Sequence, residues 1–511
     1  MNKKFTLLLI LSFAFIYAQP PIIGWQKCMG GTGGDLAESI QLTPDGGYIM
    51  SGYSSSSDGD ATANHGGSDY WIVKFNATGT IAWQKSLGGT ASDISKSILL
   101  TSDGGYIVCG QTYSNDGDVS GNHNFWDYWV IKLSATGTVE WKKTYGGPGS
   151  DFAYSIENTA DGGYIMAGSC ESNGGDVTGN HGQSDFWIVK VNASGSIQWQ
   201  KSLGGTNNES ASDIQATPDG GYIVAGYSFS INGDVTGNHG NVDSWIVKLS
   251  SSGILQWQKS MGGTGWDYAD SIRNTNDGGY IVTGRTASTD GDITANHGGN
   301  DYWVMKLNAT GNIQWQKTYG GSGEDIGHQI DHTADGGYVI TGYSNSADGD
   351  VTGNHGDYDY WIIKLDATGN LQWQKSVGGA GLDRANALAI DSNGDYMVAG
   401  RTSSNDGDVS GNHGGTGDCW VVKLVPDGLA TAAFEKESIT IYPIPAGDRL
   451  QLQTPANTTI TKIKITNMSG QVVLEENQNS TSINVENLVK GMYILEASSV
   501  TDRYVYKFAK E

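Results

Sequence analysis

Cysteine and basic residues are both scarce in this chain. Four Cys in 511 residues are too few for a small disulfide-built scaffold, although an exported protein can still form one or two bridges. Lys and Arg total 30 against 54 Asp and Glu, which gives a formal net charge of -24. This charge argues against nucleic acid or anionic membrane as partners, because both need basic surface to replace counterions. Cations or neutral ligands such as glycans fit it better.

Proline and long apolar runs are also rare. The chain has 9 Pro but 75 Gly, with 10% aromatic and 16% charged residues. Such a composition is typical of a turn-rich globular protein and favours an all-β architecture. After residue 17 no apolar run is long enough to cross a bilayer, so we expect no membrane insertion.

The N-terminal residues 1–18 have the pattern of a secretory signal peptide. Lys3 and Lys4 precede an apolar run from Phe5 to Tyr17 that ends at Ala18. This pattern predicts export, with cleavage near Ala18. The first Cys is Cys28, which is too distant from the apolar run for a lipid anchor at this end.

Tryptophan recurs along the chain with a constant period of 58 residues. One column consists of Trp25, Trp83, Trp141, Trp199, Trp257, Trp315 and Trp373. A second column keeps the same period and ends one residue late, at Trp420, because the last unit carries one inserted residue. Seven repeated units follow from this count.

Each unit predicts four short strands separated by turns. Around residue 280 these are "YADSIRNT", the turn "NDGGY", "YIVTGRTAS", a long loop, "YWVMKL", the turn "NATGN" and "IQWQKTY". Asp-Gly turns between such runs favour tight hairpins. Four-stranded units of constant length predict a seven-bladed β-propeller over residues 19–428, which we expect to be monomeric.

The order of strands predicts how the ring closes. The chain begins with a fourth-type strand, "IIGWQKC", and the seventh unit stops after its third strand, "CWVVKL". The N-terminal strand should therefore complete the last blade. If the register that pairs Leu365 with Leu371 holds there, Cys28 falls opposite Cys419. We expect a disulfide between them, the alternative being two buried thiols.

The columns "DGGY", "DYWIVKL", "ATG" and "WQK" resemble the β-propeller repeats of exported bacterial proteins, over residues 22 to about 428. After a linker at 429–438, residues 439–511 change character. Their strand-like segments and the motif around Tyr442, Pro443 and Pro445 resemble the C-terminal sorting domain of type IX secretion substrates in Bacteroidota. The usual Tyr-Pro-Asn-Pro is interrupted by Ile444. The resemblance implies a small β-sandwich, contact with the type IX machinery, and release or attachment at the cell surface.

The long loops are candidates for calcium binding. Counted as twelve residues from Asp58, the first loop places acids at positions 1, 3 and 12, with a Thr at position 5. Calcium takes six to eight oxygen ligands at spacings of this sort. The alternative is that these side chains cap their own backbone. The candidate ligands in four loops are Asp58, Asp60, Thr62, Asp69, Asp116, Asp118, Asp127, Asp290, Asp292, Asp301, Asp348, Asp350 and Asp359.

Two other columns keep one kind of side chain, a His or an acid, in every unit and predict structural roles. One is the His column from His65 to His413, and the other is the acid column from Asp35 to Asp383. A catalytic centre needs different groups converging on one place, which identical repeats do not supply.

Specificity should lie where the sevenfold symmetry breaks, near the mouth of the channel. Two variable columns run close to the acid column, and neutral drift is the alternative explanation for both. From them we select these candidate ligand-binding residues: Glu38, Lys96, Tyr154, Asp270, His328, Phe152, Tyr268 and Arg384.

Two classes of function remain open. The first is a secreted or cell-surface binding module, adhesin-like or specific for a glycan or protein, with calcium in its loops. The second is an extracellular polysaccharide lyase or glycoside hydrolase at the channel mouth, using residues such as Glu38, Tyr154 and His328 as acids or bases. The regularity of the units favours the first class, and we predict no catalytic residues.

Overall fold

The computed structural model describes residues 19–426, 440–442, 446–453, 460–467, 471–476, 482–498 and 503–510. The expected signal peptide at 1–18 and linker at 429–438 lie outside them. The chain divides into two compact units between residues 427 and 428. No described segment forms a helix with the length and apolar character needed to cross a bilayer.

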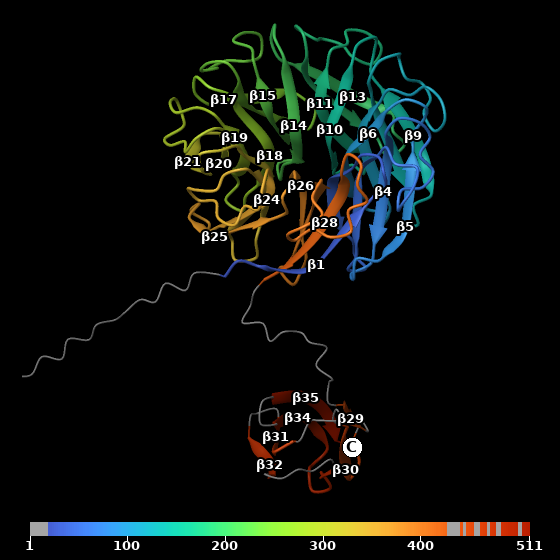
Figure 1. Cartoon of the computed structure of the whole chain (residues 1–511), viewed down its shortest axis with the longest axis vertical. Helices are drawn as coiled ribbons and strands as arrows, with labels where there is room; N and C mark the ends of the chain where they lie inside the picture. The colour runs from blue at the N-terminus through green and yellow to red at the C-terminus, as the bar shows by residue number, and fades with distance from the viewer. Residues whose placement is uncertain are drawn as a thin grey trace, which may run out of the picture. The chain divides into compact units, whose positions relative to one another are not determined.

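The first unit is a ring of seven four-stranded antiparallel sheets, which confirms the seven-bladed propeller (Figure 1). Blades 1 to 3 contain β2 (Asp35–Leu42), β3 (Tyr48–Ser54), β4 (Asp69–Phe75) and β5 (Ile81–Leu87); β6 (Asp93–Leu100), β7 (Tyr106–Thr112), β8 (Asp127–Leu133) and β9 (Val139–Tyr145); and β10 (Asp151–Asn158), β11 (Tyr164–Cys170), β12 (Asp185–Val191) and β13 (Ile197–Leu203). Blades 4 and 5 contain β14 (Glu209–Ala216), β15 (Tyr222–Ser228), β16 (Asp243–Leu249) and β17 (Leu255–Met261); and β18 (Asp267–Asn274), β19 (Tyr280–Thr286), β20 (Asp301–Leu307) and β21 (Ile313–Tyr319). Blades 6 and 7 contain β22 (Asp325–His332), β23 (Tyr338–Ser344), β24 (Asp359–Leu365) and β25 (Leu371–Val377); and β26 (Asp383–Ile390), β27 (Tyr396–Thr402), β28 (Asp418–Val425) and β1 (Ile22–Met29).

In blades 1 to 6 the third strand is buried along its whole length, because its two faces pack against the two adjacent blades. In β8 every residue of "DYWVIKL" is buried, and Trp129 is 1% exposed. Tyr70 stacks on Trp129 of the next blade with ring centroids 4.6 Å apart, and its hydroxyl donates to the Trp129 carbonyl at 2.9 Å. These contacts between adjacent blades account for the fixed aromatic columns in the sequence.

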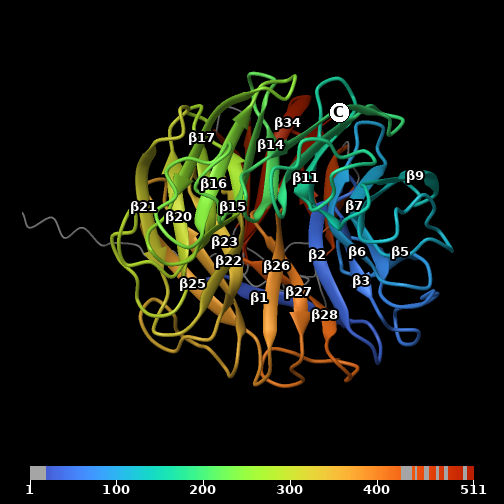
Figure 2. The same cartoon turned by 90° about the horizontal axis from the view of Figure 1, so that it is seen from above.

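The N-terminal strand closes the ring as predicted. β1 pairs with β28 in antiparallel fashion and completes blade 7. Trp420 Nε1 donates to Gln26 across this pairing at 2.7 Å. Figure 2 shows β2, β14 and β26, which are innermost strands, facing the middle of the ring.

The register on which the expected disulfide was based is wrong. In blade 6 a β-bulge lies between Lys364 and Leu365 and shifts the remaining register by one residue, and β1 has an equivalent shift between Ile23 and Trp25. Cys419 therefore lies opposite Met29, and Cys28 lies opposite Trp420. Consecutive strand residues point to opposite faces. The two Cys consequently belong to different core clusters, and all four Cys among the described residues are buried free thiols.

The second unit contains two small antiparallel sheets around one core. The first consists of β29 (Thr440–Tyr442), β30 (Arg449–Gln453) and β33 (Ser482–Asn484), and the second of β31 (Lys462–Asn467), β32 (Val472–Glu476), β34 (Gly491–Ser498) and β35 (Arg503–Lys510). Leu450 and Ile483 of the first sheet share a buried cluster with Ile463, Leu495 and Phe508 of the second. Two sheets packed through a common core form a β-sandwich.

Candidate functional site

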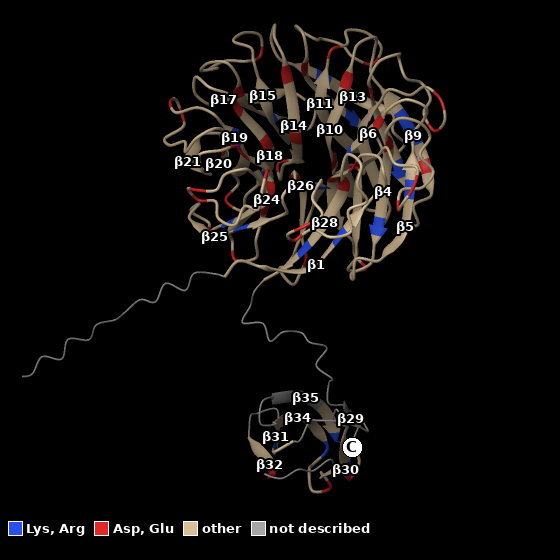
Figure 3. Ribbon diagram, in the orientation of Figure 1, with Lys and Arg blue, Asp and Glu red and all other residues tan. Residues whose placement is uncertain are grey.

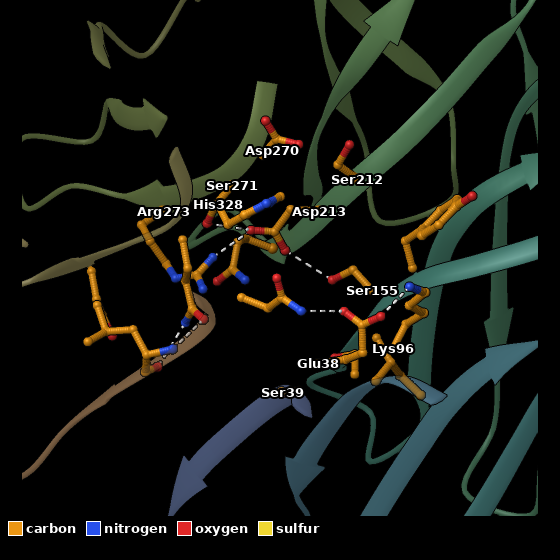
Figure 4. Close-up of a pocket in the computed structure, with 18 of the residues that line it drawn as sticks. Glu38, Ser39, Lys96, Ser155, Ser212, Asp213, Asp270, Ser271, Arg273 and His328 are labelled. Atoms are coloured by element: carbon orange, nitrogen blue, oxygen red, sulfur yellow. Dashed lines mark hydrogen bonds and ion pairs between the residues drawn. The ribbon is translucent and has the colours of Figure 1, made fainter. Parts of the chain in front are cut away.

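A cavity of about 650 Å³ occupies the axis of the propeller. The innermost strands of all seven blades contribute to its lining, which includes Glu38, Lys96, Tyr154, Asp270 and His328. Figure 4 shows Glu38, Lys96, Asp213 and Arg273 meeting in this space from different strands. The structure thus brings together, around one cavity, five candidate ligand-binding residues that lie far apart in the sequence.

A β-bulge in each innermost strand places these side chains. In blade 1 the pairing of β2 with β3 shifts between Ala37 and Ser39, which leaves Glu38 as the extra residue. The other six blades have the same shift at the same position. A bulge re-aims the side chain of its extra residue. The seven extra residues, called the bulge ring below, all line the cavity: Glu38, Lys96, Tyr154, Ser212, Asp270, His328 and Asn386.

Charge in the bulge ring is partly neutralised within the ring. Lys96 forms an ion pair with Glu38, and Asn386 Nδ2 lies 3.4 Å from the other Glu38 oxygen. Burial alone would lower the pKa of Lys96, but the Glu38 carboxylate outweighs burial and raises it. Burial lowers the pKa of His328 more than the nearby Asp270 raises it. His328 is therefore a neutral imidazole at pH 7, able to donate or accept a hydrogen bond.

Deeper in the channel, Asp213 forms the centre of a polar network. It accepts hydrogen bonds from Ser155 at 3.0 Å, from Ser271 at 3.2 Å and from Arg273 at 2.6 Å. This carboxylate links blades 3, 4 and 5, and its hydrogen bonds predict a structural role. Near it, burial raises the pKa of Glu157 to about 7. Sequence reasoning missed Glu157, although it too breaks the repeat, in a column that reads Gln41, Leu99, Glu157, Gln215, Arg273, Asp331 and Ala389.

The second variable column lies at one end of the cavity, in contact with aromatic groups. Its blade 4 member, Ser210, lines the cavity together with its cross-strand partner Tyr227. Tyr268 packs against Tyr227 with centroids 4.9 Å apart. The Arg384 guanidinium lies 4.8 Å from the ring centre of Tyr343.

We call this end of the channel the mouth. It comprises Tyr227, Trp266, Tyr268, Arg285, Tyr343, Tyr358, Arg384 and Arg401. Phe152 lies apart from these residues, beside Trp126 in blades 2 and 3, with ring centroids 6.1 Å apart. Sequence reasoning selected only Tyr268 and Arg384, because the others come from second strands and loops that it treated as packing or turns. Arginine could have identified this end of the channel from the sequence. The propeller has only four Arg, and each stands at a position where most of the other units have a different residue.

The acid at the first position of each of these four long loops accepts hydrogen bonds from a different residue. Asp58 accepts hydrogen bonds from the Thr32 amide at 2.7 Å and the Thr32 hydroxyl at 2.9 Å. Asp116, Asp290 and Asp348 accept the amides of Thr90, Thr264 and Ser322 in the same way.

The remaining calcium candidates are also engaged by separate groups. Asp69, Asp127, Asp301 and Asp359 are buried and accept from a loop His. The Asp60 amide donates to the Gly30 carbonyl, and Asp118 accepts from Lys142. The Asp292 and Asp350 carboxylates accept the Gly262 and Gly320 amides, and the Thr62 carbonyl accepts from Ser86. Among the described residues no group of three or more His, Cys, Asp or Glu could hold a metal ion. Calcium binding stays a prediction, and the geometry favours backbone capping.

The His column and the acid column form repeated structural hydrogen bonds. His123 Nδ1 lies 2.7 Å from Asp127 Oδ2, and the other six blades repeat this pair. In the acid column, Asp151 is fully buried and accepts from the Gly147 amide at 2.9 Å and the Ser172 hydroxyl at 2.7 Å. Burial raises the pKa of Asp151 to about 7.

Comparison with known proteins finds proteins that are similar in sequence or structure. The curated "Regulatory protein FlaEY" of Caulobacter vibrioides is 23% identical over 514 residues, which cover 88% of this chain and 53% of that protein, so the chain spans about half the length of this relative. PorZ of Porphyromonas gingivalis is similar in structure, with a TM-score of 0.39 and 11% identity over 92% of this chain and 59% of PorZ. The extracellular domain of BT4673 from B. thetaiotaomicron gives a TM-score of 0.42 and 11% identity, over 96% of this chain and 60% of that one.

The C-terminal unit matches a known family. Residues 440–511 match the model of the secretion system C-terminal sorting domain. This match covers the two small sheets described above, and it agrees with the resemblance that the sequence showed around Tyr442. The chain is therefore a β-propeller protein with a type IX sorting domain, which directs it to the cell surface or beyond.

Proposed function

We propose that this exported propeller is a binding protein whose ligand, a glycan or a protein segment, docks at the mouth and reaches into the bulge ring. One observation carries the proposal. The seven bulges have the same backbone geometry, but seven different side chains project from them into one cavity of about 650 Å³. A scaffold that repeats its packing residues and varies the residues around one cavity has the arrangement expected of a ligand site.

The mouth adds exposed aromatic surface to this cavity. Trp266 is 53% exposed, and its ring lies 6.4 Å from that of Tyr268. Tyr227 continues the cluster inward and lines the cavity itself. Large aromatic rings beside a polar cavity provide stacking faces and hydrogen-bonding groups together.

Binding of the purified chain to an array of bacterial and host glycans and to a peptide library tests the proposal. We expect a ligand whose binding falls at least tenfold in Tyr268→Ala and in His328→Ala. The control is Lys317→Gln on the outer strand β21, where Lys317 donates to Asn370 at 2.8 Å. Ligands that bind equally to all three variants would place the binding surface elsewhere and refute the proposal.

The second candidate function is a polysaccharide lyase or glycoside hydrolase at the same cavity. Two observations favour it: a buried Asp270 oxygen has no hydrogen-bond partner, and His328 is neutral and suited to act as a base. Release of unsaturated sugars or new reducing ends, abolished in His328→Ala, would establish it. Binding without product release would favour the binding module.

A further inference from the structure

Arginine in the propeller is confined to the central channel. The sequence has four Arg between residues 19 and 426, namely Arg273, Arg285, Arg384 and Arg401. Arg273 lines the cavity, and the other three belong to blades 5 and 7 at the mouth. Acidic residues are distributed around the whole ring (Figure 3). A chain with a net charge of -24 thus gathers its few guanidinium groups at one place.

Two of these guanidinium groups stack on tyrosine rings. Arg285 lies 4.1 Å from the ring centre of Tyr268. Arg384 lies 4.8 Å from that of Tyr343 and 4.9 Å from that of Tyr358. Stacking uses the face of a guanidinium and leaves the N–H groups at its edge available.

Two of the guanidinium groups have no anion of their own. The Nε atoms of Arg384 and Arg401 are buried without a hydrogen-bond partner. Among the described propeller residues, the arginine ion pairs are those of Arg273 with Asp213 and of Arg285 with Asp270, the latter at 3.9 Å. Leaving a partly buried cation unpaired costs stability, which an incoming anion would offset.

Two acids near the mouth are engaged by other groups. Glu38 is paired with Lys96. Glu324, close to Tyr358, accepts a hydrogen bond from Asn300 Nδ2 at 2.5 Å. Among the described residues, neither Glu38 nor Glu324 forms an ion pair with Arg384 or Arg401.

Gly417 of blade 7 leaves space for Arg401. Gly417 has φ = +123°, and a Cβ at this position would lie 2.8 Å from Arg401 Nε. Blade 6 has Tyr358 immediately before its third strand, where blade 7 has Gly417. A side chain here would therefore displace the guanidinium.

We propose that the mouth binds an acidic saccharide. Its carboxylate or sulfate accepts hydrogen bonds from Arg384 and Arg401, and an adjoining sugar ring stacks on Tyr268 and Trp266. This inference rests on the proposed binding function and specifies its ligand class. It also departs from the expectation from net charge, which favoured cationic or neutral ligands, because three of the four Arg of the propeller lie at the mouth. Guanidinium groups match carboxylate and sulfate through paired N–H donors.

Calorimetric titration with matched oligosaccharides tests the inference. The probes are an oligogalacturonate, its carboxyl-reduced counterpart, a sulfated galactan oligosaccharide and its desulfated counterpart. We expect one acidic probe to bind at least tenfold more tightly than its neutral counterpart, and the pair that shows the difference identifies carboxylate or sulfate as the anion. Arg384→Gln and Arg401→Gln should each weaken that binding at least tenfold, because each removes hydrogen bonds to a charged group. Lys317→Gln, with the same change in charge, should leave it unaltered.

The possible results separate this inference from the proposed function. Equal binding of acidic and neutral probes, weakened by Tyr268→Ala but not by Arg384→Gln, would overturn the anion site and keep the binding site at the mouth. Binding of none of the four probes would also overturn the acidic-saccharide inference, whereas the proposed function would still be decided by the arrays. Thermal unfolding of each variant, with a midpoint within about 2 °C of the unaltered chain, establishes that lost binding is not lost folding.

Discussion

Replacement of Asp151 by Asn should reduce the pH dependence of stability. The Asp151 carboxyl is fully buried, and burial raises its pKa from 3.8 to about 7. Between these two values the folded chain keeps a proton that the unfolded chain has released. Stability contributed by this group is therefore greatest below pH 4 and falls as the pH rises to 7. Roughly 2.5 kcal/mol of that fall lies between pH 5 and pH 8.

An asparagine at this position resembles the protonated acid and can still accept hydrogen bonds from Gly147 and Ser172. Urea unfolding of the chain and of Asp151→Asn, each at pH 5 and pH 8, measures the effect. We expect the difference in unfolding free energy between the two pH values to shrink by about 2 kcal/mol in the variant. An unchanged difference would refute the argument that burial of the carboxyl sets its protonation.

The matched control is Asp103→Asn. Hydrogen bonds from Thr101 and Lys132 lower the pKa of Asp103 to about 2. A carboxyl with a lowered pKa contributes stability that is lost only as the pH falls below 4. Asp103→Asn should therefore leave the difference between pH 5 and pH 8 unaltered.

Three further predictions concern the bulge ring, the thiols and the loops. Glu38→Gln should destabilise the chain by about 1–3 kcal/mol, because it leaves Lys96 unpaired; a double-mutant cycle with Lys96→Met that shows no coupling would contradict this. Thiol titration in denaturant should find four free thiols without prior reduction, whereas two would indicate that Cys28 and Cys419 are bridged after all. Calcium and then chelator should leave the thermal midpoint unchanged, because the loop acids already accept hydrogen bonds; a rise of several degrees that is lost in Asp58→Asn would establish calcium sites.

Much of the fold could be predicted from the sequence because the repeat fixes the number of strands and blades. The period of 58 residues predicted seven units, and the leftover strand types predicted that β1 closes blade 7. The register could not be predicted, because nothing in the letters around Lys364 and Leu365 marks the bulge that separates Cys28 from Cys419. A shift of one residue reverses the face of every side chain that follows it.

The candidate site was predicted in part. Variation within a repeat identified Glu38 and the rest of the bulge ring, since this column varies while the position one residue earlier stays small. It did not identify Tyr343 or Arg401, because they lie on second strands, and only the folded ring brings second strands and first strands together at the mouth. Net charge did not point to the mouth either, because it averages over a surface on which Arg384 and Arg401 occupy one small area.

Closure of the ring by β1 has a consequence for the order of folding. Ile22 pairs with Val425, so the last hairpin joins segments roughly 400 residues apart, at a loop-closure cost of about 5 kcal/mol in chain entropy. Blades 1 to 6 can each form from contiguous sequence, but blade 7 must wait until both segments are present. The seam between β1 and β28 should therefore be the last part of the propeller to form and the first to open. During export the ring should therefore remain open until β28, which precedes the sorting domain in the sequence, has also been exported.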